Sequence, residues 1–242
     1  MTKLDAQSQM SERYLAMLSP WGRWRLNARL FCKRALWNAT LASAGIAKRI
    51  FDLAVSGTAL LMLAPLFLLI AICIKLEDGG PVIFAQTRVG RRGREFKMFK
   101  FRSMCLNAEA RLKELLLQNE HREGVTFKLK NDPRLTRAGR WLRKFSLDEL
   151  PQFYNVFRGD MAIVGPRPPL PREVALYTPA DRRRLAVKSG ITCLWQVGGR
   201  SQIDFSGQVR LDVLYIESQS FWMDVKILLR TIPAVLTGKG AC

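Results

Sequence analysis

The most distinct pattern along the chain is an uninterrupted apolar run between Leu53 and Ile74, LAVSGTALLMLAPLFLLIAICI, which contains no charged residue. At about 1.5 Å per residue, a helix of this length reaches about 33 Å, which is enough to cross the hydrocarbon core of a bilayer. A buried core helix of the same length normally keeps a polar face. The pattern therefore predicts a helix that inserts into a membrane.

Two features bear on the topology of this segment. Pro65 lies near its middle, where it removes a backbone hydrogen bond and bends or breaks a helix. Lys and Arg are abundant on both sides, with nine in residues 1–50 and eight in residues 75–102. Because a crossing segment usually keeps its positive excess on the cytoplasmic side, symmetric flanks favour a re-entrant helix–break–helix with both ends cytoplasmic. A kinked single span is an equal alternative on these features alone.

The N-terminal segment, residues 1–46, intersperses Trp21, Trp24 and Trp37 with basic residues. This mixture is typical of an amphipathic helix that lies at a membrane interface. A cytosolic surface helix with the same composition is the alternative.

Behind the apolar run, the pattern changes to shorter elements. PVIFAQTRVGRRGREFKMFKFRSM has two β-rich stretches around a basic, Gly-containing turn, which predicts a hairpin that pairs Pro81–Arg88 with Glu95–Arg102. Asn107–Asn119 is typical of a polar helix. Asp132 followed by Pro133 predicts the start of another helix, with the Asp as its cap and the Pro in its first turn.

Four arginines recur at every third position in RLTRAGRWLRKF: Arg134, Arg137, Arg140 and Arg143. This spacing predicts one helical stripe, which is either a solvated face or a cationic surface beside an anion site. Downstream, the turn-rich GDMAIVGPRPPLP (Gly159–Pro171) holds Arg167 between two prolines, which favours either an Arg fork aimed at an anion or a structural proline-rich edge. Val209–Leu236 predicts helices that pack on the domain or lie at the membrane interface.

The charge balance narrows the class of partner. The chain has 39 Lys and Arg against 20 Asp and Glu, a formal net charge of +19, which favours nucleic acid, anionic lipid or phosphorylated substrates as partners. Five scattered cysteines argue against a disulfide framework or a zinc site. The one histidine, His121, lies in a polar segment typical of solvated surface, so carboxylates are the stronger candidates for proton or nucleophile chemistry.

Two adjacent acids, Asp148 and Glu149, stand out in FSLDELPQFYNV at the end of the basic run. Ser146 and Glu149 have the spacing of a capping box, but Pro151 would then delete a bond in the new helix. A helix that begins at Pro151 leaves both acids just ahead of it. The functional alternative is that one carboxylate attacks a phosphorus atom while its neighbour holds Mg²⁺, with the arginines as counter-charge.

Long motifs in this chain resemble those of the bacterial sugar transferases, the monotopic phosphoglycosyl transferases that start exopolysaccharide, capsule, O-antigen and glycoprotein glycan assembly. The resemblance rests on the apolar segment with KMFKFRSM, on KFSLDELPQFYNVFRGDMAIVGPRPPL, on GITCLWQVGGR and on SFWMDVKILLRT. It covers about residues 47–240 in order and is similar to the short form of the family. Residues 1–46 match no part of it.

The resemblance implies transfer of a sugar 1-phosphate from a UDP-sugar to undecaprenyl phosphate, with release of UMP. It implies that Asp148 is the nucleophile of a covalent phosphosugar intermediate and that Glu149 binds Mg²⁺. The residues it implies as substrate contacts are Arg143, Arg167, Lys100, Arg102, Gln152 and Asp224. Asp224 has a helix cap as its alternative role.

The expected fold is α+β and mainly helical, with three parts: an interfacial segment (1–46), a re-entrant membrane helix (47–76), and a cytosolic catalytic domain (77–242) with interfacial amphipathic helices and a small β-hairpin. We expect a monotopic protein of the bacterial inner membrane whose catalytic domain lies on the cytoplasmic face. Membrane lipids are expected partners, nucleic acid is not, and a homodimer is compatible with this class. Two other functions compete: a glycosyltransferase that releases UDP, and a membrane-anchored basic module that binds nucleic acid or anionic lipid.

Overall fold

The computed structural model describes residues 19–108, 110, 132–199 and 203–237. The chain divides into two units, residues 1–50 and 51–242, and the first helix, α2 (Pro20–Met62), has residues in both. At its start the Ser19 hydroxyl accepts a hydrogen bond from the Gly22 N–H (3.0 Å), and Pro20 occupies the first turn, as is usual at a helix N-terminus. Most of the predicted helix Asn107–Asn119 lies outside the described residues, as does His121.

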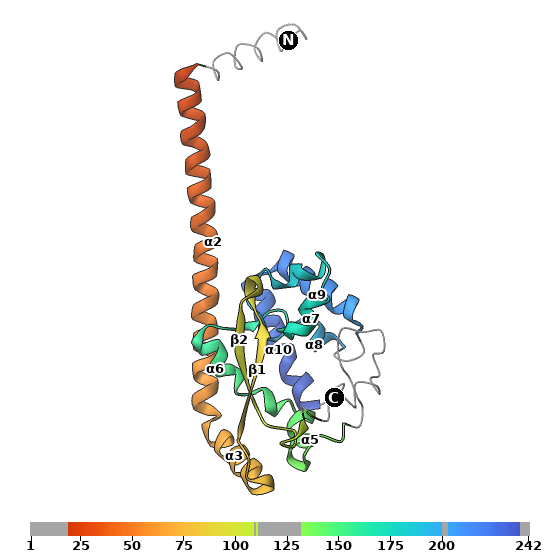
Figure 1. Cartoon of the computed structure of the whole chain (residues 1–242). Coiled ribbons are helices and arrows are strands. Elements are labelled where there is room, and N and C mark those ends of the chain that lie inside the picture. The colour runs from red at the N-terminus through yellow and green to blue at the C-terminus, as the bar shows by residue number, and fades with distance from the viewer. Residues whose placement is uncertain (1–18, 109, 111–131, 200–202, 238–242) are drawn as a thin grey trace. The chain divides into compact units, whose positions relative to one another are not determined.

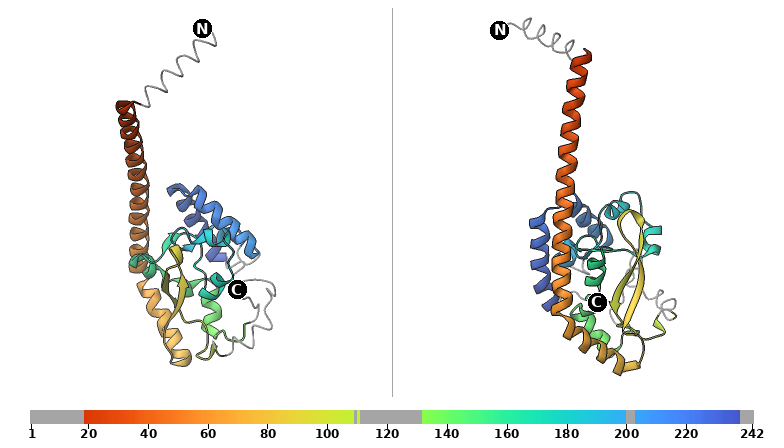
Figure 2. Two further views of the ribbon diagram at one scale, coloured as in Figure 1. Left: turned by 45° about the horizontal axis from the view of Figure 1, so that its top comes forward. Right: turned by 90° about the vertical axis from the view of Figure 1, so that its left-hand side faces the viewer.

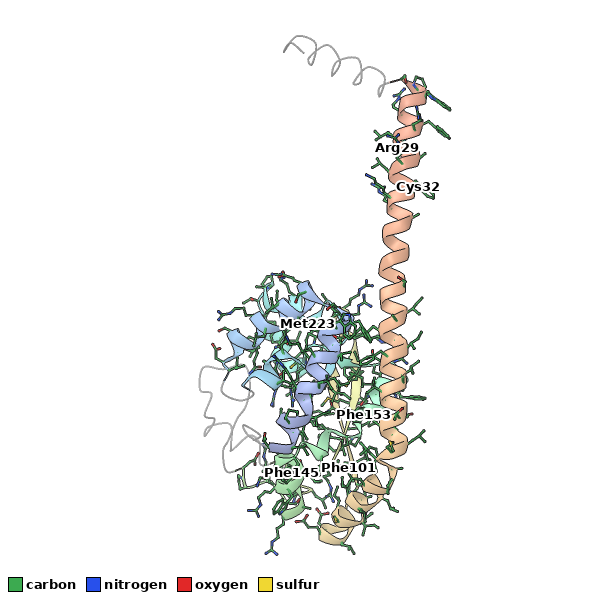
Figure 3. The ribbon with its side chains drawn as sticks, turned by 180° about the vertical axis from the view of Figure 1, so that it is seen from behind. Arg29, Cys32, Phe101, Phe145, Phe153 and Met223 are labelled. Atoms are coloured by element: carbon green, nitrogen blue, oxygen red, sulfur yellow. The ribbon has the colours of Figure 1, made fainter. Side chains whose placement is uncertain are left out.

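The first unit contains the helix expected for the N-terminal segment, beginning at Pro20. Trp21 and Trp24 stack with ring centroids 5.0 Å apart, and both are exposed over more than half of their surface, 65% and 59%. Arg29 and Cys32 project from the same stretch (Figure 3). The interfacial location of this helix stays a prediction.

The apolar segment forms two helices with a sharp bend between them (Figure 1). Helix α2 ends at Met62 and α3 (Ala64–Asp78) follows, with Pro65 in its first turn. No single helix within the described residues is long and apolar enough to span a bilayer. Gly45–Met62 and Ala64–Asp78 meet that test as a pair, and they bend by 59°. By length and composition, the pair fits a broken span or a re-entrant loop.

The predicted hairpin is confirmed. Strand β1 (Ile83–Val89) pairs antiparallel with β2 (Glu95–Phe101), in a register that sets Ile83 opposite Phe101 and Val89 opposite Glu95 (Figures 1 and 2). The turn contains a short 3₁₀ helix, η1 (Arg91–Gly93), and Gly93 has the positive φ (80°) that glycine adopts readily. Met98 and Phe101 are both buried, and because they are three apart on β2 they lie on opposite faces of the strand, each in a different core cluster.

The helix predicted at Asp132 and Pro133 begins later than expected. Helix α5 (Arg137–Lys144) is capped by Thr136, whose side chain accepts from the Gly139 N–H at 2.9 Å. The Asp132 carboxylate instead accepts from the backbone N–H and guanidinium of Arg134. Asp and Asn side chains commonly form such local turns, which compete with helix. Arg134 is therefore buried in an ion pair outside the helix and does not extend the stripe.

The remaining elements form a helical assembly around a second, parallel pair of strands. In chain order they are η3 (Leu147–Glu149), α6 (Gln152–Arg158), β3 (Ala162–Val164), α7 (Pro171–Ala175), η4 (Asp181–Leu185), β4 (Gly190–Thr192), α8 (Leu194–Gly198), α9 (Phe205–Ser218) and α10 (Phe221–Thr237). Strands β3 and β4 pair in parallel. The helices predicted over Val209–Leu236 are confirmed as α9 and α10.

Two buried clusters hold the second unit together. One centres on β3 and includes Met161, Ile163 and Val164, with Phe153 and Met223 packed against it (Figure 3). The other joins α3 to the hairpin and α5, and consists of Ile70, Ile74, Phe101 and Leu142. Through this second cluster, α3 supports the elements that carry the acidic pair and its surroundings.

Candidate functional site

The chain turns sharply to present Asp148 and Glu149. Ser146 adopts the left-handed conformation (φ 55°, ψ 22°) and starts the 3₁₀ helix η3, which contains both acids. Among the described residues its side chain makes no capping hydrogen bond, so the capping box is wrong. Helix α6 starts behind Pro151. The acids therefore lie just ahead of a helix, which was the other possibility that the sequence offered.

Two other parts of the chain converge on the two carboxylates. Lys100, from β2, places its Nζ 2.6 Å from Glu149 Oε1 and 3.8 Å from Asp148 Oδ2. Arg167, from the proline-rich loop behind β3, places Nη1 3.3 Å from the same Glu149 oxygen. The Asp148 side chain is only 8% exposed and that of Glu149 16%, whereas that of Arg167 is 35% exposed. Arg167 is thus the cation of this group that solvent reaches best.

The two acids have opposite electrostatic environments. Burial raises the pKa of Asp148, and the attraction of Lys100 only partly opposes it. Burial would raise the pKa of Glu149 as well, but Lys100 and Arg167 outweigh it and hold that pKa at about 2. Burial lowers the pKa of Lys100 against the pull of both carboxylates, while Glu149 raises the pKa of Arg167. A firmly ionised carboxylate therefore stands beside a more basic one, a combination typical of functional sites.

Arg143 lies in the last turn of α5, which ends just before the 3₁₀ helix that contains Asp148 and Glu149. Its Nε donates to the Ser103 hydroxyl at 3.1 Å, and its charge contributes to lowering the pKa of Asp148 against burial. Of the predicted stripe, Arg137 and Arg140 are exposed on the same helix. The structure thus brings Lys100, Arg143 and Arg167 to the acids.

Three other predicted site residues have different surroundings. Arg102 forms a two-pronged ion pair with Asp78, with Nη1 2.8 Å from Oδ2 and Nη2 close to Oδ1. Asp224 is buried and accepts from the Tyr215 hydroxyl at 2.7 Å. Gln152 opens α6 and is 3% exposed. The contacts of Arg102 and Asp224 in the described chain are structural, and substrate contact by these three residues stays a prediction.

Sequence reasoning missed one charged residue of the site, Arg88 on β1. Its charge acts on Glu149, Lys100 and Arg167. The sequence pattern that could have identified Arg88 is the alternation of side chains along a strand. Gln86 and Arg88 are two apart and so face the same side, in a hairpin whose partner strand supplies Lys100.

The acidic pair suits a magnesium site in which the protein supplies only one or two ligands and water and substrate supply the others. Among the described residues, no group of three or more His, Cys, Asp and Glu side chains is placed to hold a metal ion. Mg²⁺ commonly takes one or two protein carboxylates and completes its shell with water and substrate phosphate. Glu149 fits this role because it is ionised and its contacts with Lys100 and Arg167 both fall on Oε1.

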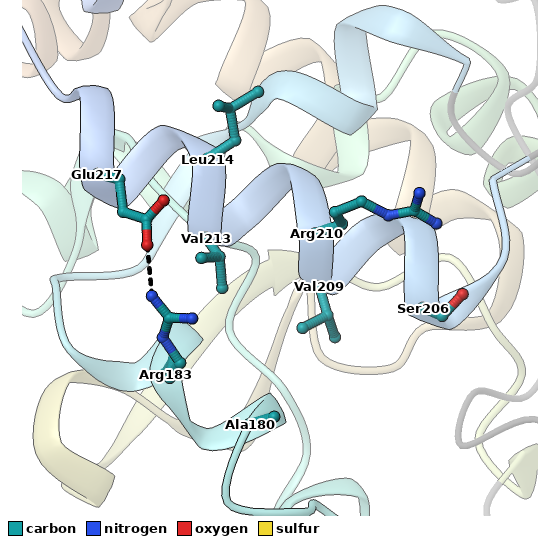
Figure 4. A pocket seen from close by; sticks show the side chains of 8 residues that line it. All are labelled: Ala180, Arg183, Ser206, Val209, Arg210, Val213, Leu214 and Glu217. Atoms are coloured by element: carbon teal, nitrogen blue, oxygen red, sulfur yellow. Dashed lines mark hydrogen bonds and ion pairs between the residues drawn. The ribbon is translucent and has the colours of Figure 1, made fainter.

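A separate pocket lies between η4 and α9. It is lined by Ala180, Arg183, Ser206, Val209, Arg210, Val213, Leu214 and Glu217, and Arg183 and Glu217 form an ion pair at one end (Figure 4). None of its lining residues belongs to the group around Asp148.

Comparison with known proteins covers most of the chain. The family model described as bacterial sugar transferase matches residues 43–238. The chain is 50% identical over 199 residues to the galactosyl transferase CpsE of Streptococcus agalactiae, which covers 81% of this chain and 43% of that protein. It is 42% identical over 200 residues to the exopolysaccharide production protein ExoY of Rhizobium meliloti, covering 81% and 88%.

A third relative is the undecaprenyl-phosphate galactose phosphotransferase of Salmonella typhimurium, 42% identical over 207 residues, which cover 84% of this chain and 43% of that protein. The chain therefore spans less than half the length of CpsE and of the Salmonella protein, and most of the length of ExoY.

Proposed function

Because this chain belongs to the bacterial sugar transferase family, we propose that this transferase moves a sugar 1-phosphate from a UDP-sugar to undecaprenyl phosphate and so starts assembly of a polysaccharide or glycan. Relatives named for this chemistry include the Salmonella undecaprenyl-phosphate galactose phosphotransferase. Another, from Aeromonas hydrophila, is named a UDP-N-acetylgalactosamine-undecaprenyl-phosphate N-acetylgalactosaminephosphotransferase.

The observation that carries the proposal is a buried carboxylate surrounded by cations. A carboxylate is repelled by the negative oxygens of a diphosphate unless positive groups offset their charge. Lys100 lies 3.8 Å from Asp148, and Arg143 and Arg167 add to the positive potential at the same carboxyl. Burial raises the pKa of Asp148, which makes it a stronger base and nucleophile than an exposed Asp.

The reaction divides into two displacements at one phosphorus atom. In the first, an Asp148 oxygen bonds to the sugar-bearing phosphorus of the UDP-sugar, the bond from that phosphorus to the bridging oxygen breaks, and UMP leaves. In the second, a phosphate oxygen of undecaprenyl phosphate bonds to the same phosphorus and the bond from that phosphorus to the Asp148 oxygen breaks, which regenerates the carboxylate. Covalent catalysis of this kind lets a soluble donor and a lipid acceptor use one site in turn.

The other residues of the site bind and neutralise the phosphates. Arg167, which is more exposed than Lys100, takes the donor diphosphate, and Arg143 and Lys100 offset charge next to Asp148. Glu149 holds Mg²⁺, which when bound neutralises phosphate oxygens. As phosphate enters, it replaces Glu149 as the partner of Arg167.

Location follows from the lipid substrate. We propose that residues 47–76, where the end of α2 meets α3, form the re-entrant membrane anchor, that residues 1–46 lie at the interface, and that the catalytic part faces the bacterial cytoplasm. Undecaprenyl phosphate would then meet the site at the bilayer surface, so lipids are partners and nucleic acid is not.

The released nucleotide tests this function. The full chain in lipid nanodiscs, incubated with undecaprenyl phosphate, Mg²⁺ and a panel of UDP-sugars, is expected to release UMP, and EDTA is expected to stop the release. Release of UDP would instead identify a glycosyltransferase. Asp148→Asn should abolish both half-reactions and remove the phosphosugar adduct seen by intact mass in the wild type. Lipid-linked product at wild-type levels from that variant would refute the nucleophile assignment.

A further inference from the structure

The Arg88 side chain is hydrogen-bonded to the loop that carries Arg167. Its Nη1 donates to the Pro168 carbonyl at 3.1 Å, while Nε (3.1 Å) and Nη2 (2.7 Å) donate to the side-chain oxygen of Gln86. The neighbouring Val89 N–H donates to the Pro169 carbonyl at 2.9 Å. Strand β1 therefore donates hydrogen bonds to the carbonyls of the two residues that follow Arg167.

The composition of the loop explains why carbonyl contacts matter here. Pro166, Pro168 and Pro169 have no N–H, so their stretch of backbone can be held only through carbonyls or side chains. The Pro166 carbonyl accepts from the Gly190 N–H at 2.9 Å. With Arg88 on Pro168, the residues on both sides of Arg167 are fixed, by β4 and β1 respectively.

Holding two guanidinium groups near each other is unfavourable. Burial lowers the pKa of Arg88 to about 10, and the positive charge of Arg167 contributes to that shift. Glu149 and Glu173 compensate in part. A neutral donor could hold the Pro168 carbonyl without this repulsion, so the charge at position 88 points to a role beyond packing.

We propose that Arg88 is a positioning residue for phosphate binding: it fixes the Arg167 loop through Pro168 and adds positive potential where the diphosphate enters. Gln86 orients the Arg88 guanidinium for this contact. The proposal rests on the proposed function, because it assigns Arg167 to the phosphates of the nucleotide sugar.

A double-mutant cycle separates this role from a general effect on folding. Arg88→Met should lower kcat/KM for the UDP-sugar by about 10- to 100-fold, the cost of losing a charged hydrogen bond and its field. Arg88→Lys keeps the charge without the fork and should lose less. In an Arg167→Met background, Arg88→Met should add less than about 3-fold, because the guanidinium that the loop contact positions is gone. Equal effects in both backgrounds, or wild-type activity of Arg88→Met, would overturn the proposal.

Arg91 offers a matched control on the same hairpin, since its Nε also donates to a backbone carbonyl, that of Ala186, at 3.2 Å. Arg91→Met should leave kcat/KM near the wild-type value, and an equal loss there would also count against a specific role for Arg88.

Amide hydrogen exchange gives a readout that does not depend on the reaction. The Val89 and Leu170 amides should exchange faster in Arg88→Met and not in Arg91→Met, and unchanged exchange would contradict the loop contact. Release of UDP by the wild type would contradict the proposed function. The exchange measurement would still test whether Arg88 holds the Arg167 loop.

Discussion

At the scale of single residues, Asp148 and Glu149 are neighbours whose pKa values move in opposite directions. Burial raises that of Asp148, and Lys100 with Arg167 hold that of Glu149 at about 2 against burial. A folded-state pKa above the unfolded value means that the ionised group destabilises the fold above that pKa, and a depressed pKa means the reverse. The two carboxylates therefore make opposite contributions to stability at neutral pH.

This opposition predicts opposite effects of two similar substitutions. Asp148→Asn should raise the free energy of unfolding at pH 8 by about 1 kcal/mol, since it removes a buried charge. That gain should shrink as the pH falls through the raised pKa of Asp148, where the wild type takes up a proton. Glu149→Gln should lower stability by about 3 kcal/mol, because it leaves Lys100 and Arg167 without their anion.

Thermal unfolding in detergent at pH 5 and pH 8 measures both variants. At this chain length the change should be about 2–4 °C per kcal/mol. If Asp148→Asn lowered the midpoint as much as Glu149→Gln, attraction to the cations would outweigh burial at Asp148 and the pKa assignment would be wrong.

Ser146 stores a small amount of backbone strain next to Asp148, the proposed nucleophile. Its φ of 55° lies in the left-handed region, which costs a non-glycine residue about 1–2 kcal/mol. Its side chain makes no capping bond within the described chain. Ser146→Gly should therefore raise the unfolding midpoint and keep activity, whereas Ser146→Val should lower both, as measured by thermal unfolding and UMP release. A lower midpoint for Ser146→Gly would show that the hydroxyl stabilises the turn.

At the scale of elements, side chains from helices satisfy the open edges of the two small sheets in the described structure. On β2, the Asn155 amide accepts from the Phe99 N–H (2.9 Å) and donates to the Lys97 carbonyl (2.7 Å). On β3, the Asp52 carboxylate accepts from the Ile163 N–H at 2.9 Å. Unpaired edge groups are costly when buried, so these bonds fix where helix and strand meet.

The Asn155 bridge ties the strand that carries Lys100 to the helix behind the acidic pair. Asn155→Leu removes both bonds at similar volume and leaves two backbone groups unsatisfied, which should destabilise the protein by about 2–4 kcal/mol. Activity should fall further than folding alone explains, because Lys100 is then free to shift. The test measures activity at a temperature where the variant is fully folded. Tyr154→Leu, on the exposed side of α6, is the control. Full activity there would exclude a positioning role.

The elements also show what the sequence can and cannot predict. The hairpin was predictable because two seven-residue β-rich stretches flank a Gly-containing turn. Strands β3 and β4 have three residues each, too few to show a period, and pair across 25 intervening residues. The place of the acidic pair just ahead of a helix was one of two alternatives that the local motif offered. The Arg102–Asp78 pair and the Arg88–Pro168 contact were not, since each depends on a tertiary approach that no local pattern records.

At the scale of the whole molecule, the apolar segment contacts the rest of the second unit on both sides of its bend. Before Leu63, Asp52 of α2 bonds to Ile163 in β3. Beyond it, Asp78 pairs with Arg102, and the Glu77 carboxylate accepts from the Arg137 N–H at 2.6 Å at the start of α5. A segment that crossed a bilayer would separate its ends by about 30 Å of hydrocarbon. Contacts of both ends with one catalytic unit favour a re-entrant topology over a kinked span.

Cysteine accessibility tests this topology. In a cysteine-free background, single cysteines at Lys48 and at Lys75 flank the apolar run Leu53–Ile74. The native cysteines must be replaced because Cys32 and Cys73 are themselves exposed. Both introduced cysteines should react with a membrane-impermeant maleimide only when the cytoplasmic face is open, as in inverted vesicles. A kinked span predicts labelling of one from each side. Re-entry would also explain how both arms stay packed against the unit that holds Asp148, so a split result would require the Asp52 or the Asp78 contact to be absent in the membrane.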